Sequence, residues 1–152
     1  MAIRHGVALA AALILAGSAP ALAQSKLANA KSVSCTFPQM SMGNWKADGT
    51  PQTDVKPATL TLTYMDIDTQ DGTASVKGLV GNLYIIVRYV PGYLHFFATD
   101  NAGPVYLTTI FERANGPNKY KAVHTRHEFT DVQLAGFTSR PEQYLGDCEI
   151  TE

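Results

Sequence analysis

Hydrophobic and polar residues alternate with a period of two along most of the chain. In the segment ATLTLTY (58–64), Leu60, Leu62 and Tyr64 fall on one side of an extended chain and the threonines on the other, as in a half-buried β-strand. No long segment shows the 3.6-residue period of an amphipathic helix. Short strand-like runs, separated by Gly, Pro, Asn and Asp, cover residues 33–37, 58–68, 73–80, 82–90, 93–99, 104–111, 119–129 and 142–150. We therefore predict an all-β fold, an antiparallel meander of about eight strands.

The N-terminus has the layout of a secretory signal peptide over residues 1–23. An apolar run over 7–16 follows a basic start, and the small residues ALA at 21–23 provide a cleavage site. The run is shorter than the roughly 20 residues of a membrane-spanning helix, and Gln24 stands where a lipid anchor would need a cysteine. We expect a periplasmic or secreted protein without a membrane anchor, with a flexible leader over residues 24–32.

The two cysteines, Cys35 and Cys148, lie in the first and last predicted strands. An isolated pair in an exported chain most often forms a disulfide, and no Cys-X-X-Cys motif points to a redox role. Bridged residues need Cα atoms about 5–6 Å apart, close to the spacing of neighbouring strands. We therefore predict a disulfide between the first and last strands, and a closed or nearly closed barrel of calycin-like size. It is a single domain over residues 33–152.

The charge balance excludes one class of partner. The 152-residue chain carries 12 basic and 13 acidic residues, a formal net charge of −1 at pH 7. This balance gives no electrostatic reason to bind nucleic acid or an anionic membrane, so we expect neither.

Turn positions predict the register of the strands between residues 82 and 129. A two-residue Pro91-Gly92 turn places Arg88 opposite His95. The next two turns are expected to place His95 opposite Thr108, and Thr108 opposite His124. This register predicts an outward face with six candidate ligand- or partner-binding residues, which are Arg88, His95, Phe97, Tyr106, His124 and Arg126. The predicted core face holds Leu83, Ile85, Val87, Leu94, Phe96, Ala98, Val105, Leu107, Phe111, Val123 and Phe129, joined by Thr125 and His127.

The predicted outward face is rich in aromatic residues for a surface in contact with water. Three explanations remain open. The first is that the connection over residues 38–57, with the only tryptophan, lies across this face. The second is that another subunit or a protein partner covers the face, and the third is that the face binds a ligand. For Trp45 itself we expect the role of a plug at one end of the barrel.

The sequence gives little support for a metal site or cofactor. On a strand, His124 and His127 point to opposite faces and do not chelate one ion. The aspartates of DIDTQDG (66–72) depart from the EF-hand spacing and indicate a hairpin turn. No G-x-S-x-G motif or phosphate-binding glycine loop occurs. We therefore predict no cofactor and no metal, and assign no catalytic residue.

Four motifs carry a resemblance to a known family, and they are Leu94-His95-Phe96, LTTIF (107–111), AVHTRH (122–127) and QYLGDC (143–148). Over roughly residues 74–149 the chain resembles a family of small, exported, uncharacterised proteobacterial proteins with the pattern LHF, LTTxF, AVHxRH and QYxGxC. The His-X-Arg-His and Gly-X-Cys pieces are its most specific parts. The resemblance implies export and brings no activity or binding residue with it.

Three functions of different classes follow from these patterns. The first is an exported binding module for a small molecule or a protein partner. The alternative is a periplasmic enzyme in which His124, Arg126 and Glu128, on one strand face, act as general acid and base. The second alternative is a structural protein of the cell envelope. A hollow barrel interior would favour a small ligand, and a filled one would favour recognition at the surface.

Overall fold

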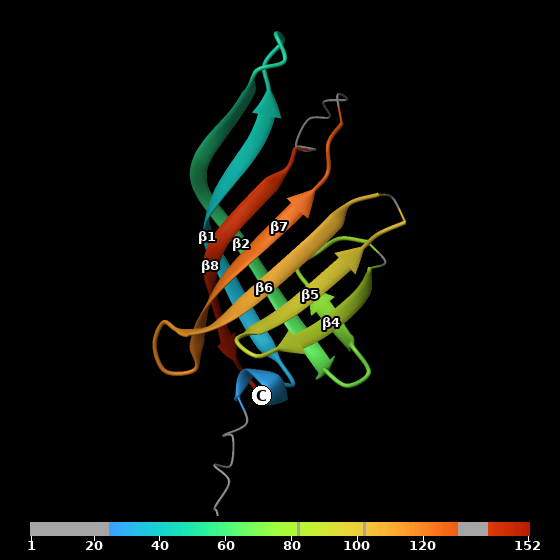
Figure 1. The fold of residues 1–152 in the computed structure, drawn as a ribbon, viewed down its shortest axis with the longest axis vertical. Helices are drawn as coiled ribbons and strands as arrows, with labels where there is room; N and C mark the ends of the chain where they lie inside the picture. Colours follow the sequence, from blue (N-terminus) through green and yellow to red (C-terminus); the bar gives the residue numbers. More distant parts are fainter. Residues whose placement is uncertain (1–24, 82, 102, 131–139) are drawn as a thin grey trace, which may run out of the picture.

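The computed structural model describes residues 25–81, 83–101, 103–130 and 140–152; the predicted signal peptide lies outside them. The described chain forms a short 3-10 helix and eight strands (Figure 1), which are η1 (Leu27–Asn29), β1 (Val33–Trp45), β2 (Pro51–Asp68), β3 (Thr73–Lys77), β4 (Tyr84–Val90), β5 (Tyr93–Thr99), β6 (Val105–Ala114), β7 (Lys119–His127) and β8 (Glu142–Ile150). Within these ranges no helix has the length and apolar character needed to cross a membrane.

All eight strands belong to one antiparallel sheet in the order β3-β2-β1-β8-β7-β6-β5-β4. Consecutive strands pair with each other except β3 and β4, and β1 also pairs with β8. The sheet curls until β4 meets the β2–β3 turn, where the Val87 N–H donates to the Gly72 carbonyl at 2.8 Å. Gly72 has a φ of 75°, and a Cβ there would lie 3.2 Å from the Val87 carbonyl oxygen, so a glycine suits this close approach. The predicted meander and nearly closed barrel are confirmed.

The disulfide joins the first strand to the last, as predicted. Cys35 and Cys148 lie directly opposite each other in the β1–β8 ladder, and they are bonded across 113 positions of sequence. Both are almost completely buried. The bond therefore reinforces a seam that backbone hydrogen bonds already close.

One end of the barrel interior is tightly packed with apolar side chains. Tyr64 and Phe96 stack at its centre with ring centroids 3.9 Å apart. They are surrounded by further fully buried residues, which are Val33, Phe37, Leu62, Val87, Leu94 and Ile110. These side chains occupy alternate positions of their strands, as the period of two requires.

The short helix η1 seals this packed end. Leu27 is completely buried and Ala30 is 3% exposed. The Lys31 N–H donates to the Glu152 carbonyl at 2.8 Å, and the Ile67 N–H donates to the Lys31 carbonyl at 3.1 Å. The sequence predicts a flexible leader over 24–32; its described part is instead packed against the core.

Strands β1 and β2 extend beyond the other strands as a ribbon (Figure 1). The sequence predicts a long connection over residues 38–57, but 39–45 pairs with 51–57. Trp45 is 50% exposed and packs edge-on against Phe129 with centroids 5.1 Å apart. The expectation that Trp45 plugs the barrel is therefore wrong, and the ribbon projects past the barrel instead of lying across its outer face.

The register of the middle strands departs from the prediction at one hairpin. Arg88 lies opposite His95, and Thr108 lies opposite His124, as predicted. Between β5 and β6, however, His95 lies opposite Thr109. A slip of one residue exchanges the two faces of a strand, so the inward and outward positions of β6 and β7 are the reverse of those predicted.

Pro104 provides a physical reason for the slip. It has no N–H to offer to a ladder, and its carbonyl accepts a hydrogen bond from the Asp100 N–H at 3.3 Å. Pro104 therefore belongs to the turn, and the ladder begins with Thr99 opposite Val105.

Candidate functional site

The slip divides the six predicted binding residues between two faces of the sheet. Those that stay on the outer face are Arg88, His95 and Phe97. Those that turn inward and line a cavity are Tyr106, His124 and Arg126. The prediction of one shared outward face is wrong, and the structure brings only the three inner residues together.

The same slip reverses the other predictions for β6 and β7. His127 is exposed at the end of β7, so the prediction that it faces the core is wrong. Other residues predicted in the core lie on the outer face or are partly exposed, and they are Val105, Leu107, Phe111, Val123, Thr125 and Phe129. The inward positions are occupied instead by Thr108, Ile110 and Ala122.

A cavity of about 340 Å³ lies at the mouth of the barrel, at the end opposite η1. Its described walls are Leu60, Gly78, Leu79, Val80, Asp100, Pro104, Tyr106, His124, Arg126, Glu128, Glu142 and Tyr144. Small-molecule sites are commonly about 300–1,000 Å³, so this cavity is at the lower end of that range. The barrel is filled at one end and hollow at the other.

His124 lies where the cavity meets the packed core, at the end of a buried chain of hydroxyl groups. The Tyr64 hydroxyl is 2.7 Å from Thr108 Oγ1, and Thr108 Oγ1 is 2.7 Å from His124 Nδ1. None of the three residues is more than 1% exposed. The other ring nitrogen, Nε2, makes no hydrogen bond to any residue in the described ranges, so the imidazole has one nitrogen left for the cavity.

Aromatic rings hold the imidazole in place. Its centroid lies 5.8 Å from that of Phe37, 6.0 Å from that of Tyr106 and 5.7 Å from that of Tyr144. Rings packed at these distances restrict rotation of the side chain. The direction of both nitrogens is therefore set by the core.

Burial controls the charge of the hydrogen-bonded groups Tyr64, Thr108 and His124. It lowers the pKa of His124 from the usual 6.5 to about 4, and the positive charge of Arg126 acts in the same direction. Burial also raises the pKa of Tyr64 to about 12. At pH 7 both ends of the chain are therefore uncharged.

A cluster of charged residues forms another wall of the cavity. Arg126 pairs with Glu128 and lies 3.6 Å from Glu142 Oε2. The Tyr144 hydroxyl donates to the same Glu142 oxygen at 2.7 Å. Since Glu142 is only 6% exposed, these partners offset the desolvation of its charge. Burial and the bond to Glu142 raise the pKa of Tyr144, so this hydroxyl stays a donor.

The acid–base candidates proposed from the sequence do meet in this cavity, and they are His124, Arg126 and Glu128. Sequence reasoning missed Glu142, Tyr144 and Tyr64. A signal existed for the first two, because alternate residues of the last strand lie opposite Arg126 and His124 in the β7–β8 ladder. Tyr64 carried no such signal, since its contact crosses the barrel and depends on closure.

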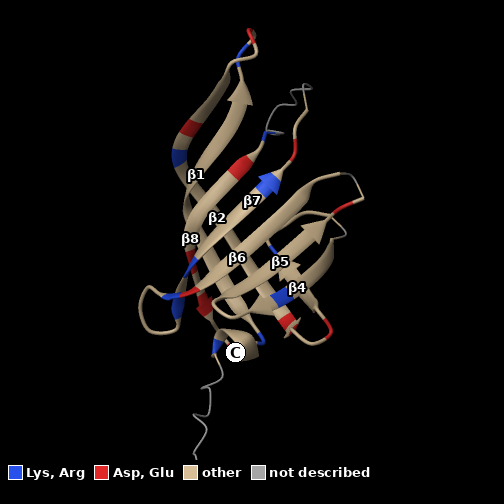
Figure 2. Cartoon of the chain, viewed as in Figure 1, with Lys and Arg blue, Asp and Glu red and all other residues tan. Residues whose placement is uncertain are grey.

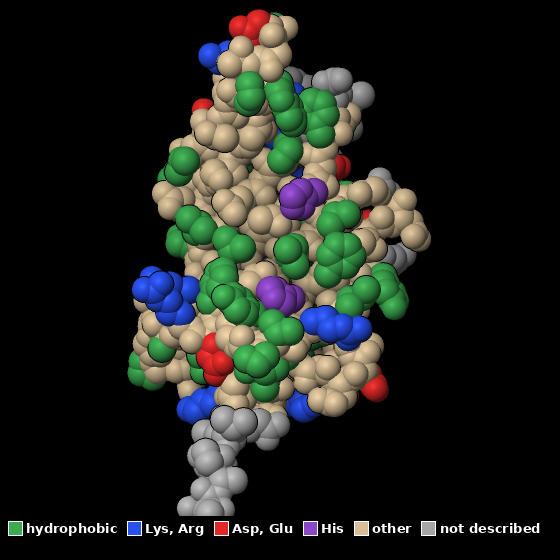
Figure 3. Space-filling view, in the orientation of Figure 1, with side chains coloured by type: hydrophobic (Ala, Val, Ile, Leu, Met, Phe, Trp, Pro, Cys, Tyr) green, Lys and Arg blue, Asp and Glu red, His purple; other side chains and the backbone are tan. Residues whose placement is uncertain are grey.

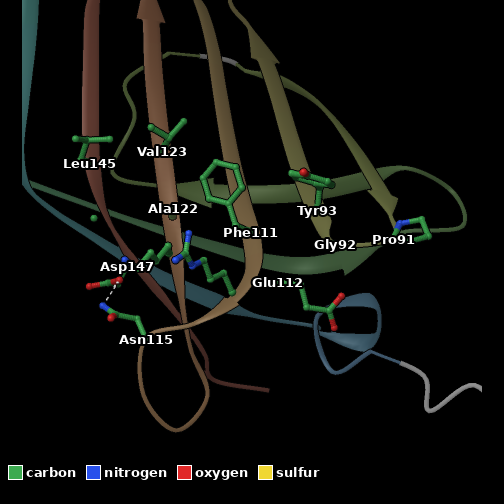
Figure 4. A pocket seen from close by; sticks show the side chains of 13 residues that line it. Pro91, Gly92, Tyr93, Phe111, Glu112, Asn115, Ala122, Val123, Leu145 and Asp147 are labelled. Carbon is green, nitrogen blue, oxygen red and sulfur yellow. Dashed lines mark hydrogen bonds between the residues drawn. The ribbon is translucent and has the colours of Figure 1, made fainter.

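The outer face of β5–β8 carries a second, apolar surface (Figure 3). Tyr93 is 44%, Phe97 37% and Leu145 52% exposed. A groove of about 830 Å³ crosses this face, with Phe111 and Val123 projecting from the strands between Tyr93 and Leu145 (Figure 4). No charged residue interrupts β5 (Figure 2). The groove also has a polar end, where Asn115 donates a hydrogen bond to Asp147 at 2.7 Å, but it is open across the outer face of the sheet instead of entering the barrel.

In the described part of the chain, no group of three or more His, Cys, Asp or Glu residues is placed to hold a metal ion. Comparisons with protein-family models, curated proteins and solved structures found no match. The function is therefore inferred from the geometry of the cavity itself.

Proposed function

We propose that the chain is an exported binding module whose barrel mouth takes a small ligand. The observation that carries this proposal is His124, a buried and neutral imidazole whose Nε2 has no hydrogen-bond partner in the described ranges and which lines a cavity. A neutral imidazole nitrogen that is not engaged by the protein is free to bond to a molecule in the cavity. A ligand that makes this bond would be held in a defined orientation, because the core fixes the direction of the ring.

The rest of the cavity supports a small organic ligand. Leu60 and Leu79 supply aliphatic wall, and Tyr106 and Tyr144 supply aromatic wall beside a few polar groups. Apolar walls with a small number of placed polar groups are typical of ligand sites, and barrel mouths are a common place for them.

Export is supported by two independent features. Residues 1–23 have the layout of a signal peptide. The Cys35–Cys148 disulfide is of the kind that persists in oxidising compartments.

A protein partner is the second candidate, and the outer apolar face favours it. Tyr93, Phe97 and Leu145 leave large apolar areas in contact with water, and such patches usually mark interaction surfaces. A second copy of the chain or another protein on this face would appear as an added protein mass in the experiment below.

Native mass spectrometry tests the proposal most directly. The full chain is expressed with its signal peptide in a bacterial periplasm and sprayed without denaturation. We expect a bound small mass on the wild type that is lost in Leu79→Trp, which fills the cavity from its wall. Val55→Trp is the matched control, since Val55 is 66% exposed on the ribbon and does not line the cavity.

Two results would contradict the proposal. One is a wild-type protein that carries no small mass under varied growth conditions. The other is a ligand that Leu79→Trp retains as fully as Val55→Trp does.

A further inference from the structure

We propose that the mouth cavity takes an uncharged ligand with a carbonyl-type oxygen, such as a ketone, amide, ester or lactone, and that the Nε2–H of His124 donates to this oxygen. The inference rests on the proposed binding function and adds the chemical class of the ligand. It depends on which ring nitrogen holds the proton, and on the charges around the cavity.

The hydroxyl chain decides the position of the proton. Each hydroxyl has one hydrogen to donate, and in the described ranges Thr108 is the only hydrogen-bond partner of the Tyr64 hydroxyl. If Tyr64 donates to Thr108 and Thr108 donates to His124 Nδ1, both hydroxyl hydrogens are used. Nδ1 is then an acceptor, so the single proton of the neutral ring is on Nε2.

The other arrangements leave a buried donor unused. If Nδ1–H donates to Thr108 and Thr108 donates to Tyr64, the tyrosine hydrogen has no acceptor. If Tyr64 and Nδ1–H both donate to Thr108, the threonine hydrogen has none. Because Tyr64 and Thr108 are at most 1% exposed, water does not easily replace the missing acceptor, and each such orphan is destabilising.

His124 therefore offers the cavity a donor and no base. The lone pair of the ring is on Nδ1 and is engaged by Thr108. A ligand must bring an acceptor atom to Nε2. The same assignment weakens the alternative in which His124 acts as a general base toward a substrate in the cavity.

The surrounding charges disfavour an anionic acceptor. Among the described lining residues, Asp100, Glu128 and Glu142 carry carboxylates and only Arg126 carries a positive charge. A carboxylate or phosphate ligand would meet a surplus of like charge in a partly desolvated site. A cationic amine would suit this surplus but would bring only donors to the Nε2–H. An uncharged carbonyl satisfies both conditions.

The tautomer is measurable in the unliganded protein. Long-range proton–nitrogen NMR of ¹⁵N-histidine-labelled protein at pH 7 distinguishes Nδ1–H from Nε2–H rings, and His124→Phe assigns the signal. We expect an Nε2–H ring for His124. An Nδ1–H ring or a charged ring would overturn the inference.

Four probes of one shape test the ligand class, and they are 2-acetylnaphthalene, 2-ethylnaphthalene, 2-naphthoate and 2-naphthylmethylamine. Fluorescence titration should show the ketone binding about three- to tenfold tighter than the hydrocarbon, which is the gain expected from one hydrogen bond. Water favours the free ketone over the free hydrocarbon, so this order is not what hydrophobicity alone would produce. The anion and the cation should bind more weakly than the ketone.

A pair of variants locates the effect. His124→Phe keeps a ring in the cavity but removes the donor, and it should abolish the advantage of the ketone. His127→Phe makes the same change at an exposed position three residues away and should preserve it. If His124→Phe does not fold, as judged by circular dichroism, the wild-type ranking still decides, and His95→Phe and His127→Phe assign the His124 signal in the NMR measurement by elimination.

The failures are distinguishable. If none of the probes binds, the proposed cavity function fails together with the inference. If probes bind but the hydrocarbon, the anion or the cation equals or exceeds the ketone, the cavity stands and only the ligand class is wrong.

Discussion

The two ends of the barrel use the same strands in different ways. Toward η1, the inward positions of β7 and β8 include Ala122 and Cys148, which are part of the packed core. Two residues further along β7 toward the mouth, the inward position is His124, and the next is Arg126. On β8 the inward position changes in the same way, from Cys148 at the packed end to Glu142 at the mouth. One end is sealed by apolar packing, and the other exposes polar groups to a cavity.

This difference separates stability from binding. At the sealed end a substitution opens a cavity or a seam, because every neighbour is already in contact. At the mouth, side chains such as Leu79 border open space, so a substitution there changes what the space accepts. His124 lies at the boundary between the two ends and contributes to both stability and binding. The experiments below test this division, beginning with the largest expected effect.

Removing the disulfide should weaken the sealed end most. Cys35→Ser breaks a bond between residues 113 positions apart, and loss of such a bond lowers the free energy of unfolding by about 2–5 kcal/mol. Urea unfolding of the variant against the oxidised wild type measures the difference. A stability unchanged by the substitution would mean that the β1–β8 hydrogen bonds close the barrel unaided.

Acid should destabilise the mouth through His124. Its pKa is about 4 in the folded chain and 6.5 as a model value, so between these values the unfolded chain binds a proton that the folded chain does not. Stability is complete above pH 6.5, falls as pH decreases, and has lost about 3 kcal/mol once pH is below 4. Carboxylates titrate in the same window, so the comparison is with His124→Phe, which should lack this part of the loss. If the free energy of unfolding falls by the same amount in both proteins between pH 7 and 4, the prediction is wrong.

Cutting the hydroxyl chain should be less damaging. Thr108→Val keeps the shape but leaves the Tyr64 hydroxyl and His124 Nδ1 without a partner, which destabilises by about 1–3 kcal/mol. Thr61→Val is the matched control, since Thr61 is exposed on β2 and its substitution should change stability by less than about 0.5 kcal/mol. Equal melting temperatures for the two variants would show that the Tyr64–Thr108–His124 hydrogen bonds do not contribute to the stability of the fold.

The sequence was sufficient for the architecture because two signals agreed. Alternation marked the strands, and Cys35 and Cys148 showed which of them must be adjacent. The ribbon was missed because residues 38–57 are largely exposed and contain Pro, Gly and Asp. Without a buried face, a strand shows no period of two.

The site could be predicted only in part, for a related reason. On β6 both faces carry apolar residues, with Leu107 and Phe111 on one and Tyr106 and Ile110 on the other. The hydrophobic pattern therefore does not fix which face of β6 is inward. The assignment depended on the register set by the turn between β5 and β6. One turn residue, Pro104, was enough to reverse the assignment of His124.

The smallest expected effect tests that reversal most cleanly. His127 is exposed at the end of β7, so His127→Ala should change the free energy of unfolding by no more than about 0.5 kcal/mol. His124→Ala, three residues earlier, removes a ring packed against Phe37 and Tyr144 and leaves Thr108 without its acceptor, so it should lower the melting temperature by several degrees. Both variants lose the same side chain from the same strand, which makes them controls for each other. If the melting temperature falls in His127→Ala and not in His124→Ala, His124 is not the buried member of the pair, and the mouth cavity loses its donor.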